Sequence, residues 1–121
     1  PDMIKAMSSE LIFDYLGVRL NSDKALAHQF KINVIFPDRN EKFLLELKNA
    51  HLNNIENVQD KKADLTVTIN RKDLNFLLLK QVSFQQLVES GKMQLDGNGQ
   101  VFGQLLMMMD EFPFWFNVVT P

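Results

Sequence analysis

The chain has 121 residues, 45% of them hydrophobic and 23% charged, which fits one globular domain and excludes intrinsic disorder. Its 13 Lys and Arg nearly balance its 15 Asp and Glu, for a net charge of -2, which argues against a dedicated nucleic-acid binder. The absence of cysteine excludes disulfides and Cys-zinc sites while leaving the compartment open, and no apolar run reaches the ~18 residues of a membrane span.

The first part of the chain has helical spacing. Apolar residues recur every third or fourth position from Ile4 to Val18, which predicts an amphipathic helix. Ser8 is expected to cap this helix, with Glu10 in its first turn facing the positive end of the helix dipole. Ser22 is then expected to cap a short helix over residues 24–29.

From residue 30 the hydrophobic period changes to two. Residues 30–36 and 43–47 alternate around the turn residues 37–40, which predicts an antiparallel hairpin. A third strand is expected over about residues 50–57, with its register open, and a fourth over residues 65–69.

Helical spacing returns over residues 71–80 and 84–90, with Ser83 as the expected cap and Gly91 as the expected stop of the second helix. A short fifth strand follows over residues 93–96, and a glycine-rich turn leads into a last helix over residues 100–110. Strands with one polar and one apolar face keep one face in water and need a cover on the other. The sequence therefore predicts a two-layer α+β domain.

No set of residues predicts catalysis. His28 and His51 lie far apart in sequence, at the spacing of no metal site, and the serines fall at cap or turn positions. The glycine-rich run at residues 97–103 is one residue too long for a dinucleotide fingerprint and has no acidic residue at the required distance after it. We expect no catalytic residue, no metal ligand and no cofactor in this chain.

An apolar surplus toward the C-terminus is the unusual feature. The chain has ten Phe and six Met against one Tyr and one Trp. The helices expected over residues 71–80 and 100–110 carry more apolar residues than the ~100° stripe that a surface helix needs. The surplus is compatible with a thick core, with a cavity for an apolar ligand, or with a patch that docks another domain.

Several segments resemble the C-terminal domain of bacterial alkyl sulfatases. They are LIFDYLGVRLN at residues 11–21, ADLTVT at residues 63–68, SGK at residues 90–92 and WFNVVTP at residues 115–121. The resemblance implies a sterol-carrier-protein-like fold over residues 8–121, with a mainly antiparallel mixed sheet of about five strands and helices covering one face. Residues 1–7 are then expected to be a linker or lead-in from a preceding domain.

The resemblance also implies where the chemistry takes place. In the family, a metallo-β-lactamase-like domain carries zinc ions and hydrolyses the sulfate ester, while the C-terminal domain offers an apolar surface to the alkyl tail. The His-x-His-x-Asp-His run of the zinc site is absent here, so zinc and catalysis are expected in the preceding domain. The implied partners are that domain and a long-chain alkyl sulfate or other aliphatic molecule, with no nucleic acid and no transmembrane segment.

We therefore predict that the chain binds long-chain aliphatic groups as the tail-binding module of an alkyl sulfatase. The alternative is an interaction module whose apolar surface docks a catalytic domain or a second subunit. Trp115, between two phenylalanines, is expected to pack over the open end of the apolar site. The residues predicted to line or gate that site are Phe76, Leu79, Phe84, Leu87, Phe102, Leu106, Met109, Phe112 and Trp115.

Overall fold

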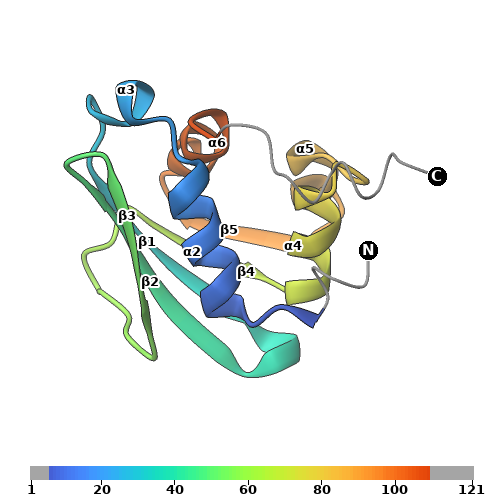
Figure 1. The fold of residues 1–121 in the computed structure, drawn as a ribbon. Helices are drawn as coiled ribbons and strands as arrows, with labels where there is room; N and C mark the ends of the chain where they lie inside the picture. Colours follow the sequence, from blue (N-terminus) through green and yellow to red (C-terminus); the bar gives the residue numbers. More distant parts are fainter. Residues whose placement is uncertain (1–5, 110–121) are drawn as a thin grey trace.

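A five-stranded sheet forms one layer of the computed structural model, which describes residues 6–109 (Figure 1). Its strand order is β3-β2-β1-β4-β5. The β1–β4 pair is parallel and the other neighbouring pairs are antiparallel, so the predicted mixed, mainly antiparallel sheet is confirmed. The strands are β1 (Phe30–Phe36), β2 (Glu41–Lys48), β3 (His51–Glu56), β4 (Leu65–Ile69) and β5 (Met93–Gly97).

The long helices cover one face of this sheet, as predicted, and the core lies between the two layers (Figure 1). Alternate side chains of β1, β2 and β4 point into the core, which explains their period of two. The helices are α2 (Ser9–Arg19), α3 (Ser22–Ala25), α4 (Arg71–Leu78), α5 (Phe84–Glu89) and α6 (Gln100–Met107), with a 3-10 turn η1 (Pro37–Arg39) between β1 and β2.

The caps predicted at Ser8 and Ser83 are confirmed, but some helix boundaries differ. Ser8 caps α2, and Ser83 forms a capping box with Gln86 at α5. The prediction of Ser22 as the cap of a short helix over residues 24–29 was wrong: α3 begins at Ser22 itself, because the side chain of Asn21 accepts the Lys24 N–H at 3.1 Å and caps the helix. The helices predicted over residues 71–80 and 100–110 end at residues 78 and 107.

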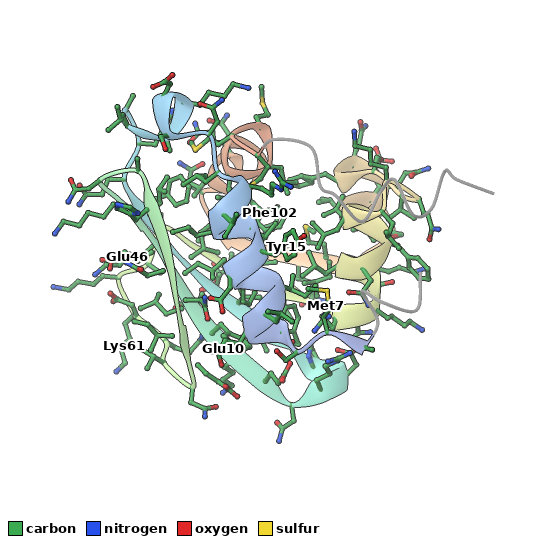
Figure 2. The ribbon with its side chains drawn as sticks, viewed as in Figure 1. Met7, Glu10, Tyr15, Glu46, Lys61 and Phe102 are labelled. Atoms are coloured by element: carbon green, nitrogen blue, oxygen red, sulfur yellow. The ribbon has the colours of Figure 1, made fainter. Side chains whose placement is uncertain are left out.

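The second face of the sheet, predicted to lie in water, is covered in part by a loop. The loop of residues 57–64 runs from β3 to β4 and reaches the middle of β1. There the Asn33 side chain donates to the Asp60 carbonyl and accepts the Asp60 N–H, both at 2.8 Å. Asn33 and Leu44 are consequently only 6% and 7% exposed. Figure 2 shows Glu46 and Lys61 on this side of the sheet, away from α2.

Asp60 also holds this crossing loop through its carboxylate. The carboxylate accepts the Lys62 N–H at 2.8 Å and the Lys31 ammonium at 3.2 Å. These bonds, the first above all, hold the pKa of Asp60 below its ordinary value. A lowered folded-state pKa means that the stabilisation is complete above the unfolded-state pKa and is lost as the pH falls through the folded-state pKa.

We therefore expect the Asp60 carboxyl to titrate at a lower pH than a free aspartate, measured by NMR of side-chain carboxyl carbons. The Lys31→Met variant should raise this pKa without restoring the free value, because the Lys62 N–H remains. A midpoint at the free-aspartate value in the unmodified chain would contradict the anchoring of the loop.

A fully buried arginine joins the start of α4 to the start of α2. The Arg71 guanidinium donates from Nε to Asn75 at 2.9 Å, from Nη1 to the Ser9 hydroxyl at 2.8 Å and from Nη2 to the Met7 carbonyl at 2.8 Å. The Ser9 hydroxyl in turn donates to Glu41 at the start of β2. Figure 2 shows Met7 at the start of α2, on the side of α4.

Burial lowers the pKa of Arg71 to about 10, so the guanidinium remains charged at neutral pH. Removing such a group leaves its buried acceptors without their donor. The Arg71→Ala variant should lose about 3–5 kcal/mol of unfolding free energy, measured by urea denaturation followed by circular dichroism. The exposed neighbour provides the control, because Lys72→Ala should change stability by less than about 0.5 kcal/mol. Equal stability of the two variants would contradict this role of Arg71.

Candidate functional site

An entirely apolar cavity lies between the sheet and the helices. Its volume is about 20 Å³. Strands β1, β2 and β4 form its floor, and α2, α4 and α6 form its walls. The lining residues are Phe13, Leu16, Val34, Leu45, Val67, Ile69, Leu74, Leu78, Phe102, Leu105, Leu106 and Met109.

The residues predicted to line the apolar site lie in several places. Phe102 and Leu106 of α6 line the cavity, and so does Met109, two residues after the end of that helix. Leu87 is buried in the same core, and Leu79 packs against it without lining the cavity. Phe76 is 41% exposed, and Phe112 and Trp115 lie outside the described residues.

An open groove of about 460 Å³ lies on the other side of Leu106. Leu77 and Phe84 contribute apolar surface to it, and polar side chains such as Lys80 form its rim. Leu106 lines both the groove and the cavity. The remaining groove residues are Gln81, Val82, Ser83 and Gln86.

Two aromatic rings also lie between the groove and the cavity. Phe84 lines the groove and Phe102 lines the cavity, and their rings meet edge to face with centroids 5.6 Å apart. The cavity and the groove are therefore separated by the single side chain of Leu106 and, beside it, by the Phe84–Phe102 pair.

The cavity is small for an organic ligand. A water-sized probe needs about 10–15 Å³, whereas a cavity that takes up benzene measures about 150 Å³. At about 20 Å³ the cavity holds little more than one such probe. An alkyl chain therefore requires the helical layer to move, and displacement of Leu106 would join the cavity to the groove.

Sequence reasoning missed the other walls of the cavity. Phe13 and Leu16 come from α2, and Val34, Leu45 and Val67 come from three different strands. Periodicity places all of them in the core, but no sequence signal distinguishes a core position beside a void from one without it, because a void depends on how distant side chains pack.

The described residues do not suit a zinc site. No group of three or more His, Cys, Asp or Glu side chains within residues 6–109 lies close enough together to hold a metal ion. His51 begins the edge strand β3, whereas His28 follows α3. The zinc that the family resemblance implies has no matching ligands here, and no step of catalysis is assigned to these residues. None of the helices described is long and apolar enough to cross a membrane.

Known proteins match this chain in both sequence and fold. The family model described as "Alkyl sulfatase C-terminal" matches residues 1–121. A linear primary-alkylsulfatase from Pseudomonas sp. is 40% identical over 121 residues, all of this chain but only 18% of the relative's length. The structure of the stereoselective inverting sec-alkylsulfatase Pisa1 from Pseudomonas sp. superposes with a TM-score of 0.86 at 29% identity, covering 89% of this chain and 17% of that one.

A small free-standing protein shares the fold. Sterol carrier protein 2 from Yarrowia lipolytica matches with a TM-score of 0.61 at 21% identity, covering 84% of this chain and 92% of that one. Identity at this level shows the fold alone. The structural match confirms the predicted sterol-carrier-protein-like, two-layer α+β architecture.

Proposed function

This chain belongs to the alkyl sulfatase C-terminal family, and on that premise we propose that it binds the aliphatic tail of a long-chain alkyl sulfate. The observation that carries the proposal is the wholly apolar cavity, which only Leu106 and the Phe84–Phe102 pair separate from the open groove. An apolar space accepts an alkyl chain without leaving any polar group unpaired.

The tail would enter from the groove. Displacement of Leu106 and separation of Phe84 from Phe102 would open the cavity and let the chain lie between the helices and the sheet. Each methylene buried there contributes up to about 0.8 kcal/mol, and this gain must exceed the cost of opening the helical layer. The proposed lining and gate remain the nine separate residues predicted from the sequence, of which Phe76 is the first and Trp115 the last.

The sulfate group would stay outside the cavity. Every residue that lines the cavity is apolar, so a charged head group placed there would lose its hydration without compensation. The rim of the groove is polar and carries Lys80. We place the sulfate ester beyond this rim, where a preceding metallo-β-lactamase-like domain with bound zinc would hydrolyse it.

The division between two domains fits the length of the relatives. The chain spans 18% of the length of the alkylsulfatases that it matches, so most of each relative lies outside the matched region. No group of three or more metal-ligating side chains lies together within residues 6–109. We therefore assign to this chain the binding and orientation of the tail, and to the preceding domain the cleavage of the ester.

Affinity should rise with tail length if the tail is buried. Calorimetric titration with n-alkyl sulfates from hexyl to dodecyl, each below its micelle concentration, should give a stepwise gain of at most about fourfold per methylene. The gain should end once the opened cavity is filled. An affinity independent of tail length would mean that the head group is recognised instead, and would refute tail burial.

A bulky side chain at the partition should block the tail. Leu106→Trp would fill the space between groove and cavity and should abolish the chain-length dependence, at a stability cost of about 1–3 kcal/mol. Met107→Trp is the matched control, because Met107 is 77% exposed on the same helix and lines neither space. Unchanged dodecyl sulfate affinity in a folded Leu106→Trp variant would show that the tail does not pass Leu106.

A further inference from the structure

A polar pocket of about 450 Å³ lies where β4 passes into α4. It shares no residue with the apolar groove, and only Ile69 with the apolar cavity. The proposed function makes no use of it. The lining residues are Pro37, Thr68, Ile69, Asn70, Asp73, Gly91, Lys92 and Gln94.

The carboxylate of Asp73 faces this pocket without a partner. Asp73 is only 4% exposed, yet within residues 6–109 no hydrogen bond or ion pair reaches its side chain. In that part of the chain only the Arg19 Nε is both fully enclosed and unpaired, so the unpaired Asp73 oxygens keep a small area in contact with open space. The open space beside Asp73 is the polar pocket.

The Asp73 carboxylate does not serve as a cap for helix α4. An acidic side chain in a first turn usually accepts one of the free backbone N–H groups of the helix. In α4, Asp38 already accepts the N–H of Arg71 at 2.7 Å and of Lys72 at 3.3 Å. The Asp73 N–H donates to the Asn70 carbonyl at 3.0 Å. The Asp73 carboxylate is therefore left over after the helix start is satisfied.

We propose that this pocket binds a guanidinium or ammonium group, with Asp73 as its counter-ion. A buried carboxylate is costly until an opposite charge with hydrogen-bond donors approaches it. Further acceptors stand close by, because Thr68 and Gln94 are register partners on β4 and β5, and Asn70 precedes α4.

The walls suit a side-chain-like cation better than a metal ion. Pro37 and Ile69 give the pocket apolar surface against which the methylene stem of an alkyl cation would pack. A hard metal ion needs several oxygen ligands, whereas Asp73 is the single carboxylate of this pocket. Lys92, exposed at the rim, forms no ion pair with Asp73 in the described structure, but its charge would compete with an incoming cation.

The cation has two possible sources with the same chemistry. It is either a free organic cation, or an arginine or lysine side chain of a neighbouring domain. The second source rests on the proposed function, which places a catalytic domain beside this one. The pocket is separate from the apolar groove, so the failure of tail binding and the failure of cation binding are distinguishable.

The test is an NMR titration of the 121-residue chain with butylguanidinium chloride at constant ionic strength. We expect saturable amide shifts at Thr68, Asn70 and Gln94. Asp73→Asn should weaken binding at least about tenfold, because it removes the charge while keeping the shape. Lys92→Met should strengthen binding. Asp96→Asn, which removes an exposed charge from β5 outside the pocket, is the matched control and should leave binding unchanged.

The absence of saturable shifts, or equal binding by the folded Asp73→Asn variant, would overturn the proposal. Equal weakening by Asp73→Asn and Asp96→Asn would also overturn it, since the effect would then be one of net charge. A second titration uses the full-length protein that the complete reading frame encodes. Binding there as well assigns the pocket to a free cation, whereas binding only by the 121-residue chain assigns it to a basic side chain of the neighbouring domain.

Discussion

The buried guanidinium of Arg71 is the interaction on which the arrangement of the two layers depends. It ties α4 to the residues that open α2, and through Ser9 it reaches the first residue of β2. A charge taken wholly out of water is tolerated only where donors and acceptors match, so this end of the molecule has one well-defined geometry. The cavity walls contributed by α2 and α4 are therefore held firmly at their N-terminal ends.

The starts of the three helices near the cavity and the groove are each held by a side chain. Asp38 accepts N–H groups at the start of α4, a capping box closes the start of α5, and Asn98 accepts the Gln100 N–H at the start of α6 at 3.2 Å. The end of α6 is held by the Asn21 N–H, which donates to the Met108 carbonyl at 2.8 Å. Any opening at Leu106 would move α6 against the walls formed by α2 and α4, which Arg71 joins at their starts.

How far the sequence predicts this molecule depends on the range of the interaction involved. The strands around Val34, Phe43 and Val67 were predicted because alternation is a local signal of a half-buried sheet. The loop of residues 57–64 is mostly polar and charged, which is typical of a solvent-exposed loop. Nothing near it in the sequence indicates that Asn33 binds it. The sequence predicts Arg71 at the start of a helix. Its partners Ser9 and Met7 lie more than sixty residues away, so no local pattern predicts their contact with it.

The candidate site was predicted only in part for the same reason. The apolar surplus of the last helix was visible in the sequence, and Phe102, Leu106 and Met109 do line the cavity. The position of Leu106 between a closed and an open space was not, because that depends on Phe84 and Leu77 from other helices. The unpaired state of Asp73 was equally hidden, since it follows from the distant Asp38 having taken the helix start.

Under the proposed function, the core of this domain would be subject to two opposing demands. Close packing stabilises the fold, and the cavity of about 20 Å³ is near the limit of what one water-sized probe occupies. Tail binding requires that same space to expand, so every methylene that binds must offset contacts broken between α6 and its neighbours. Larger side chains that fill the cavity would stabilise the ligand-free chain and, at the same time, weaken its binding of an alkyl tail. The apolar surplus of α6 would meet both demands, because flexible Met and Leu side chains can repack around a guest with little loss of contact.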